Sequence, residues 1–546
     1  MQGLMMDRPL LISAILQHAE RMYGKVEIVS RNADGSLTRY TYAAMARRTR
    51  RLANLLQGMG VAHGARVATL AWNDHRHLEA YYAVSGLGAV LHTCNPRLHA
   101  QQLAFVLNHS GASVLFFDPA FQALVEAIAP QCPKLRHFVA MSAASMASSA
   151  LPNLSNYEQG LESASDVLSW PEFDERSASS LCYTSGTTGD PKGVLYSHRS
   201  TVLHALVLGS AQAVGFSDQD TVLPVVPMFH VNAWGIPYVA VLNGCRLVLP
   251  GARLDGASLY ELIEGEAVTC AAGVPTIWLS LAQHMQKHGL RTSTMRRSVV
   301  GGAAMPAALI QTFAEQFDIE VRQAWGMTET SPLGTISAAA STMPDETPTE
   351  RYARNARQGR PVFGVELALG GPDGAHLPHD GKTRGELLIR GPWIASAYFN
   401  HDAPMLVDGW FATGDIATID TDGSLHIVDR VKDVIKSGGE WISSVELENA
   451  AMGHPGVLLA AVIGVPDPKW DERPCMFVVR HPEAICDKSS LLDFLSERVP
   501  KWWLPEAIEF IAELPMGATG KVQKQALRAA YAHNRALESK STSKST

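Results

Sequence analysis

A glycine- and hydroxyl-rich stretch followed by a lysine is the segment of this sequence with the clearest chemistry. It consists of Thr184, Ser185, Gly186, Thr187, Thr188 and Gly189, with Lys192 after it. Glycines allow close approach of the backbone, and N–H groups and hydroxyls donate to oxygens, so the stretch favours a polyphosphate. It is not a Walker A loop, because Pro191 and Gly193 flank the lysine and keep it out of a helix. We predict a loop that covers phosphates; a polar surface loop is the alternative.

Two further segments have residue types suited to the walls of a ligand site. Pro227 to Gly235 combines His230, Trp234 and Gly235, although a histidine in such a setting is more often a hydrogen-bonded core residue. Val299 to Pro306 contains Gly302 and Ala303 in a small-residue turn, where a planar ring has room to lie against the backbone. Taken alone, each is a weak signal.

A stacking aromatic, a hydroxyl and a carboxylate lie together after the predicted strand 320–324. Trp325, Thr328 and Glu329 would meet at the carboxyl end of that strand, where open α/β sheets bind ligands. A carboxylate beside a triphosphate suits Mg²⁺, which takes few protein ligands. Farther along, Asp415 offers an acceptor for a ribose diol. Lys521 lies in a glycine-containing turn, where a solvated lysine is the usual interpretation.

The elements that must position these residues predict an α/β fold. Residues 42–56 have helical spacing, and residues 66–72 and 113–117 are short apolar strands of the kind found in covered parallel sheets. We predict a large N-terminal domain with sheets sandwiched by helices, a β-rich subdomain after about residue 360, and a small mobile α+β C-terminal domain. The domain ranges are 1–429 and 430–546. The expected C-terminal elements are helices 445–451 and 491–498 and strands 458–465 and 475–479.

Composition excludes several classes of protein. The 546 residues include 53 acidic and 46 basic ones without a basic cluster, so nucleic acid is a poor candidate partner. No apolar run is long enough to span a bilayer. The seven scattered cysteines favour free thiols in a reducing cytoplasm. The polar tail 538–546 is expected to be disordered.

Together, these stretches resemble the AMP-forming adenylating family, which includes acyl-CoA synthetases, firefly luciferases and the adenylation domains of nonribosomal peptide synthetases. The resemblance extends from Leu10 to Lys524, with the motifs in the family's order. It implies a reaction in which a carboxylic acid and ATP form an acyl adenylate and pyrophosphate, and a thiol then takes the acyl group. The implied cofactors are ATP, Mg²⁺ and coenzyme A.

The resemblance also implies a role for each matching residue. Thr184, Ser185, Gly186, Thr187, Thr188, Gly189, Lys192 and Thr328 match phosphate contacts, and Glu329 and Thr184 match the Mg²⁺ site. Gly302, Ala303, Trp325, Gly326 and Met327 match the adenine site, with Trp325 where the family usually has a tyrosine. Asp415 and Arg430 match ribose contacts. Lys521, Glu329, Thr184 and His230 match catalytic positions, and His230, Trp234, Gly235 and Gly302 match the acid pocket.

Two matches concern movement of the C-terminal domain. Lys432 matches the hinge, and Lys521 lies in the catalytic loop 514–524. Ser437, Gly438, Gly439 and Glu440 match the loop that enters the site for the thioester step. If Lys521 and that loop lie on opposite faces of the domain, a rotation about Lys432 must separate the two half-reactions.

The acid is less well defined than the reaction. Residues 72–82, 91–97 and 227–235 resemble bacterial medium-chain fatty acid ligases and 3-methylmercaptopropionate ligases, which implies a short or medium acyl chain. The alternatives are an enzyme that loads a carrier protein and, outside the class, a kinase-like or nucleotide-binding protein that releases ADP or nothing. The expected partners are a small carboxylic acid, ATP and coenzyme A, and a homodimer is considered beside a monomer. His75 and His77 have the spacing of a metal pair but no third ligand nearby.

Overall fold

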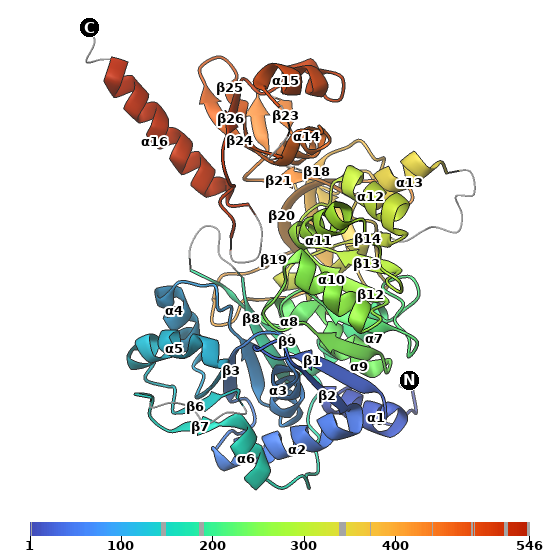
Figure 1. The fold of residues 1–546 in the computed structure, drawn as a ribbon, viewed down its shortest axis with the longest axis vertical. Helices are drawn as coiled ribbons and strands as arrows, with labels where there is room; N and C mark the ends of the chain where they lie inside the picture. The colour runs from blue at the N-terminus through green and yellow to red at the C-terminus, as the bar shows by residue number, and fades with distance from the viewer. Residues whose placement is uncertain are drawn as a thin grey trace.

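The computed structural model describes residues 1, 3–142, 149–184, 190–337, 346–371, 373–438, 440–481, 484, 486–517 and 522–542. Figure 1 shows a large N-terminal part built from helix-covered sheets and a smaller C-terminal part above it, from which helix α16 projects. The predicted fold class is therefore confirmed. No helix in the described ranges combines the length and the apolarity needed to cross a bilayer.

The first sheet has the order β7-β6-β5-β3-β4-β8-β9, and its strands pair in parallel except at the β8–β9 hairpin. Its strands are β3 (Arg66–Leu70), β4 (Val90–Thr93), β5 (Val114–Phe117), β6 (His137–Ala140), β7 (Leu154–Asn156), β8 (Ala178–Tyr183) and β9 (Gly193–Ser197). The helices of this region are α2 (Tyr42–Gly58), α3 (His75–Gly86), α4 (Ala100–Ser110), α5 (Gln122–Ile128) and α6 (Tyr157–Ser163). β5 is buried along its whole length, which explains its unbroken apolar sequence.

The second sheet has the order β16-β15-β14-β13-β12-β10-β11-β1-β2, with a parallel centre and antiparallel edges. Its strands are β1 (Glu27–Arg31), β2 (Leu37–Thr41), β10 (Thr221–Pro224), β11 (Arg246–Leu249), β12 (Cys270–Gly273), β13 (Arg297–Val300), β14 (Glu320–Gly326), β15 (Leu333–Ile336) and β16 (Arg360–Pro361). The helices are α1 (Ile12–Tyr23), α7 (His198–Leu208), α8 (Val231–Trp234), α9 (Ile236–Leu242), α10 (Gly256–Gly265), α11 (Pro275–His288), α12 (Ala307–Phe317) and α13 (Pro348–Asn355).

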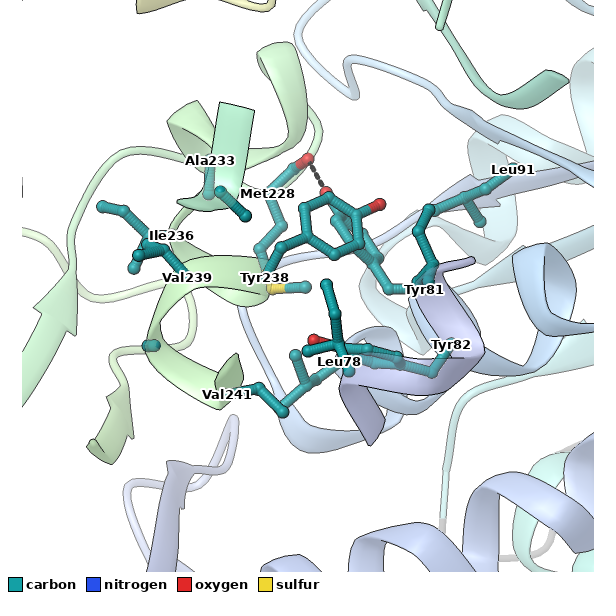
Figure 2. Close-up of a cluster of buried hydrophobic side chains, with 14 of the residues drawn as sticks. Leu78, Tyr81, Tyr82, Leu91, Met228, Ala233, Ile236, Tyr238, Val239 and Val241 are labelled. Carbon is teal, nitrogen blue, oxygen red and sulfur yellow. Dashed lines mark hydrogen bonds between the residues drawn. The ribbon is translucent and has the colours of Figure 1, made fainter. Parts of the chain in front are cut away.

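One apolar cluster joins the two sheets, because it contains buried side chains from strands of both and from α1, α3 and α9. Figure 2 shows part of it, where Tyr81 and Tyr82 of α3 lie beside Tyr238 of α9. The Tyr81 hydroxyl donates to the carbonyl of Met228, and the Tyr82 hydroxyl donates to the carbonyl of Pro237 at 2.8 Å. These bonds satisfy buried phenols and fix both ends of residues 228–237 against the core.

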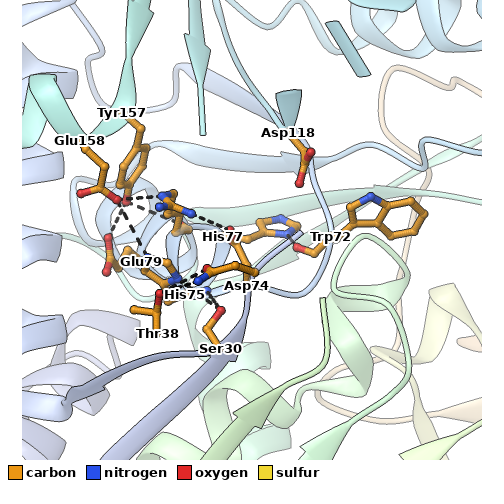
Figure 3. Close-up of polar contacts among 12 residues, drawn as sticks. Ser30, Thr38, Trp72, Asp74, His75, His77, Glu79, Asp118, Tyr157 and Glu158 are labelled. Atoms are coloured by element: carbon orange, nitrogen blue, oxygen red, sulfur yellow. Dashed lines mark hydrogen bonds and ion pairs between the residues drawn. The ribbon is translucent and has the colours of Figure 1, made fainter. Parts of the chain in front are cut away.

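A polar network surrounds the start of α3 (Figure 3). Asp74 caps the helix by accepting from the His77 N–H at 2.8 Å, and burial raises the pKa of Asp74 to about 6. The His77 ring lies 2.9 Å from the Thr69 hydroxyl, and the His75 ring lies 3.2 Å from the Ser30 hydroxyl. Burial lowers the pKa of His75 to about 3 and that of His77 to about 4. Both are neutral core histidines with protein partners, and the described residues contain no group of three potential ligands that would complete a metal site.

The β-rich part forms an antiparallel sheet of order β17-β18-β20-β19, with β21 beside β20. Its strands are β17 (Glu366–Gly370), β18 (Gly385–Arg390), β19 (Leu406–Val407), β20 (Trp410–Ile419) and β21 (Leu425–Arg430). β21 ends at Arg430, the first residue of the charged segment 430–433. The prediction of a β-rich subdomain after about residue 360 is confirmed.

The C-terminal part folds around a separate sheet of order β23-β22-β25-β24, with β26 parallel to β25. Its elements are β22 (Ile435–Ser437), β23 (Glu440–Ile442), α14 (Ser444–Met452), β24 (Val457–Asp467), β25 (Asp471–Arg480), α15 (Lys488–Ser496), β26 (Ala507–Phe510) and α16 (Lys524–Thr542). All four elements predicted here are confirmed: α14, β24 and β25 extend beyond both predicted ends, whereas α15 begins before the predicted helix 491–498 and ends at Ser496. The prediction of a disordered tail is wrong for residues 538–542, because α16 continues through them.

Candidate functional site

A cavity of about 1970 Å³ opens between the N-terminal and C-terminal parts of the chain. The predicted site residues that line it are Thr184, Lys192, His230, Trp234, Gly302, Ala303, Trp325, Gly326, Met327, Thr328, Glu329, Asp415, Arg430 and Lys432. The structure thus brings together residues from positions nearly 250 apart in the chain. Gly235, Ser437, Gly438 and Glu440 are not part of the described wall. Ser185, Gly186, Thr187, Thr188, Gly189, Gly439 and Lys521 lie outside the described residues.

The predicted phosphate loop connects the two strands of an antiparallel hairpin. β8 pairs with β9 up to Tyr183 and Gly193, and the Thr184 N–H donates to the Lys192 carbonyl at 2.9 Å. The Lys192 N–H lies 3.3 Å from the Thr184 hydroxyl. Both ends of the loop are therefore fixed at the cavity wall. The Lys192 ammonium lies 4.8 Å from the ring centre of Tyr398, a cation–π contact.

Glu329 lies on a short 3₁₀ turn, Thr328–Thr330, directly after β14. The turn is held from two sides, since the Tyr196 hydroxyl donates to the Thr328 carbonyl at 2.6 Å and the Ala395 N–H donates to the Glu329 carbonyl at 2.8 Å. The Tyr398 hydroxyl donates to Oε1 of Glu329 at 2.6 Å. The carboxylate is nearly buried, faces the same cavity as Thr184 and offers hard oxygen donors, which fits Mg²⁺.

A second group of contacts orients the carboxylate of Asp415. Asp415 and Arg430 are register partners on β20 and β21, and Nε of Arg430 lies 2.8 Å from Oδ1 of Asp415. Nε1 of Trp325 donates to Oδ2 of Asp415 at 3.1 Å. Gly334 lies against the indole ring of Trp325, because a Cβ at that position would be 2.6 Å from Cζ3. The tryptophan therefore borders the cavity and also orients the carboxylate of Asp415. The contact with Asp415 was not predicted from the sequence.

The turn that carries Gly302 and Ala303 follows β13 at the same edge of the sheet. Gly302 has φ +82°, a left-handed value that glycine adopts without strain. Gln323 of β14 holds the turn: its Nε2 donates to the Ala303 carbonyl at 3.0 Å, and its Oε1 accepts from the Met305 N–H at 3.0 Å. Gln323 is a further residue that the sequence pattern did not reveal.

The wall formed by residues 230–236 has an unusual backbone. Val231, Asn232, Ala233 and Trp234 have φ values of 47°, 51°, 49° and 58°, so four successive non-glycine residues are left-handed. Such a conformation costs about 1–2 kcal/mol for each L-residue. Gly235 follows with φ +78°, and a Cβ there would lie 2.8 Å from the His204 ring. Strain of this kind persists only where the surrounding structure holds it, and it is concentrated at functional sites.

The indole of Trp234 lies against the end of β13. A Cβ on Gly301 would be 3.2 Å from Cη2 of Trp234, so a larger residue there would press on the ring. Trp234 packs against an apolar cluster, and the members of that cluster that also line the cavity include Leu208, Val214, Phe216, Ile236, Val299, Leu333 and Ile336. An apolar tail would be accommodated here.

Described residues of the segment 514–524, which is predicted to be a catalytic loop, reach the same cavity. Leu514, Met516, Gly517 and Val522 line it, and Met516 and Val522 form an antiparallel bridge that closes the base of the loop. The described flanks of Lys521 therefore border the cavity. By contrast, Ser437 at the end of β22 bonds to Arg473, and the Gly438 N–H donates to the Trp470 carbonyl.

Sequence comparison identifies the family. The pattern of the AMP-binding enzyme family matches residues 16–399, and that of the AMP-binding enzyme C-terminal domain matches residues 446–521. The chain belongs to the AMP-binding enzyme family.

Individual relatives of this AMP-binding enzyme are CoA ligases. It is 50% identical over 533 residues to a 3-methylmercaptopropionyl-CoA ligase of Ruegeria lacuscaerulensis, with 97% of this chain and 98% of the relative covered. It is 46% identical over 533 residues to a medium-chain-fatty-acid–CoA ligase of Ectopseudomonas oleovorans, with the same coverage. The crystal structure of the anthranilate CoA ligase AuaEII with anthranoyl-AMP superposes with a TM-score of 0.87 at 26% identity, covering 97% of this chain and 99% of that chain.

A buried ionic network lies beside the catalytic-loop segment of this AMP-binding enzyme. Nζ of Lys524 lies 2.7 Å from Oε1 of Glu448 and 2.6 Å from the Ser444 hydroxyl. Ser444 in turn donates through its N–H and its hydroxyl to Oδ2 of Asp429, each at 2.6 Å. The network joins β21 to the C-terminal helices α14 and α16. Lys524 is thus a structural lysine, although it lies only three residues after Lys521.

Proposed function

We propose that the protein is an AMP-forming acyl-CoA ligase, which activates a short- or medium-chain carboxylic acid with ATP and transfers the acyl group to coenzyme A. The observation that carries the proposal is the single cavity shared by Thr184 and Lys192, Glu329, Asp415 and the apolar wall around Trp234. One space therefore offers contacts for phosphates, a ribose and an apolar acid together. The CoA ligases among the relatives support the same reaction.

The proposed chemistry follows from the charges that must meet. A carboxylate attacks an α-phosphate that is itself anionic, so positive groups and hydrogen-bond donors have to offset the charge that develops. Lys192 and the hairpin loop would serve the leaving pyrophosphate, and Asp415 with Arg430 would hold the ribose. By resemblance, Lys521 would reach the carboxylate and the α-phosphate. Mg²⁺ held by Glu329 and Thr184 would supply further charge neutralisation at the phosphates.

The proposed acid is apolar beyond its carboxylate. The wall residues around Trp234 are aliphatic or aromatic, which favours fatty acids or the thioether 3-methylmercaptopropionate over dicarboxylates. Trp234 itself projects toward Gly301 and would limit the length of the chain. His230 would lie beside the carboxylate at the mouth of this wall.

We further propose domains at 1–429 and 430–546 with a hinge near Lys432. The end of β21 at Arg430 and the start of β22 at Ile435 support this division. Described residues of the segment 514–524 border the cavity while Ser437, Gly438 and Glu440 do not, which supports a rotation between the half-reactions. Lys432→Pro is expected to slow thioester formation from supplied acyl adenylate more than it slows adenylate formation. Equal slowing of both steps would contradict the hinge.

We place the enzyme in the cytoplasm, as the seven buried free cysteines support. A homodimer remains a proposal that light scattering of the purified protein would test.

The decisive experiment measures products across a panel of acids. Purified protein is incubated with ATP, Mg²⁺ and a linear, thioether, aromatic or dicarboxylic acid, with and without coenzyme A. AMP, pyrophosphate and acyl-CoA in the presence of coenzyme A are expected for the apolar aliphatic acids. Release of ADP would refute the adenylating class. AMP formation without any acyl-CoA would refute coenzyme A as the acceptor.

A further inference from the structure

Asn232 is the one polar side chain within the left-handed turn 231–234, and it is buried. Its Nδ2 donates to the Ser180 hydroxyl at 2.8 Å, and its Oδ1 accepts from the Cys182 thiol at 3.4 Å. Burial raises the pKa of the Cys182 thiol to about 11, so the thiol keeps the proton that it donates. The amide therefore uses both of its ends on a single strand.

That strand is β8, which leads directly into the phosphate hairpin. Ser180 and Cys182 lie two residues apart on β8 and share one face of the strand, and Tyr183 and Thr184 follow at the base of the loop. The Thr93 hydroxyl of the neighbouring β4 lies 3.5 Å from the Cys182 sulfur and 3.4 Å from the Phe229 carbonyl. Asn232 therefore joins the turn directly to β8, and Thr93 links Cys182 of the same strand to Phe229, which precedes the turn.

The other side chains of the turn point to different surroundings. Val231 packs with Cys182 and Tyr196, whereas Ala233 packs in the core between the sheets (Figure 2). His230 and Trp234, at the two ends, line the cavity. Hydrophobic attraction has no direction, so these apolar contacts do not by themselves align the polar groups of the turn with β8. The directional bonds of Asn232 do, and asparagine is also among the residues that adopt positive φ most readily.

We propose that Asn232 is a positioning residue of the acid site: its amide fastens the left-handed turn to β8 and so holds His230 and Trp234 in register with the phosphate hairpin. This inference rests on the proposed function. The side chain of Asn232 does not line the cavity, so its effect on acid selection would act through the positions of His230 and Trp234. A residue that only paired with the buried polar groups of a strand would change the stability of the protein and leave its selection of acids unchanged.

The test compares Asn232→Ala, Asn232→Gly and Ser180→Ala with the wild-type enzyme. In acid-dependent AMP formation, the KM for the preferred acid is expected to rise about tenfold in both Asn232 variants, with the KM for ATP within about twofold of wild type. The preference among chain lengths is expected to broaden. Asn232→Gly separates the two causes, since glycine tolerates the backbone but lacks the amide. Wild-type acid selection in that variant would overturn the proposal.

Asn243→Ala is the matched control. Its amide also donates within this region, to the Val239 carbonyl at 2.9 Å at the end of α9, but it does not line the cavity. It is expected to leave the acid KM unchanged. Ser180→Ala is expected to reproduce part of the Asn232→Ala effect, and the double variant is expected to be no worse than Asn232→Ala, because both changes remove the same hydrogen bond between Asn232 and Ser180.

A second readout keeps the inference apart from the proposed function. Hydrogen–deuterium exchange of residues 228–236 is expected to accelerate at least fivefold in Asn232→Ala and to stay unchanged in Asn243→Ala, in the absence of any substrate. Unchanged exchange in Asn232→Ala would overturn the proposed positioning role of Asn232. If wild-type protein forms no AMP with any acid, the proposed function fails, while the exchange experiment still decides whether Asn232 holds the turn.

Discussion

Replacing Tyr398 with phenylalanine tests the metal site through a residue that touches no phosphate in the proposed reaction. The Tyr398 hydroxyl donates to Oε1 of Glu329 at 2.6 Å, and its ring lies 4.8 Å from the Lys192 ammonium. The ring also packs beside Val194 and Tyr196. Tyr398→Phe keeps the ring and its packing and removes only the hydroxyl. The change therefore isolates one hydrogen bond to the carboxylate expected to hold Mg²⁺.

The magnitude follows from the charge on the acceptor. A hydrogen bond to an ionised group contributes about 1.5–3 kcal/mol, which corresponds to about 10- to 150-fold in an equilibrium constant. Loss of a hydrogen bond that orients a metal ligand typically weakens metal affinity or activity by about 10- to 100-fold. We therefore expect the free Mg²⁺ concentration at half-maximal rate to rise at least about tenfold in Tyr398→Phe.

The assay is acid-dependent ATP–pyrophosphate exchange, titrated with Mg²⁺ at a fixed ATP concentration. Tyr82→Phe serves as the control, because the Tyr82 hydroxyl donates to a neutral backbone carbonyl away from the cavity. It is expected to leave the Mg²⁺ dependence unchanged. A Tyr398→Phe enzyme with wild-type Mg²⁺ dependence, or with a lower requirement, would refute the orienting role. Tyr398→Leu is expected to lower the rate further, because it also removes the cation–π contact.

Three further changes have defined outcomes. Trp234→Gly removes the indole and relieves a positive φ, so the ratio of kcat/KM for long over short acids should rise about tenfold, and an unchanged ratio would place the indole outside the acid pocket. Lys524→Met leaves Glu448 buried without its cation and should destabilise the C-terminal domain by about 3–5 kcal/mol, measured by urea unfolding. The double variant Lys524→Met, Glu448→Leu should recover most of the lost stability. Asp74→Asn keeps a capping acceptor and removes a buried charge. The pKa of Asp74 is about 6 in the folded protein and about 4 in the unfolded chain, so ionisation of Asp74 lowers the stability of the wild type as the pH rises through this window. The variant lacks this ionisation and should gain up to about 3 kcal/mol of stability over the wild type between pH 4 and pH 7.5. The gain should be visible as a difference in Tm that increases with pH.

Much of the fold could be predicted from the sequence, because the relevant signals are local. The apolar run at 114–117 has no polar position, which is what a strand covered on both faces requires, and β5 is buried throughout. The phosphate loop and the turn after β13 were predicted from their glycines and hydroxyls, whereas the antiparallel pairing of β8 with β9 was not. The tail was misjudged, since Ala, Leu, Arg and Glu in 527–538 favour helix strongly enough to extend α16 beyond its apolar part.

The contacts within the site could not be predicted, since they join residues far apart in the chain. Tyr398 lies 69 residues from Glu329, and Lys524 lies 80 residues from Ser444. Neither pair has a spacing that a pattern can detect. The left-handed turn shows the same limit in another form. Asn232 and Gly235 are compatible with positive φ, but Val231, Ala233 and Trp234 predict negative φ.

One small cluster accounts for the alignment of the three chemical parts of the site. Cys182 and Val194 belong to the two strands of the phosphate hairpin, Val231 belongs to the acid wall, and Tyr196 donates to the turn that carries Glu329. Tyr398 packs against this cluster and bonds to Glu329. Because close-packed interiors transmit displacement, a shift in any member is expected to move the predicted phosphate, metal and acid contacts together. In the proposed reaction the reacting groups must be closely aligned, and this shared packing would hold residues spread over more than 200 positions around one bond.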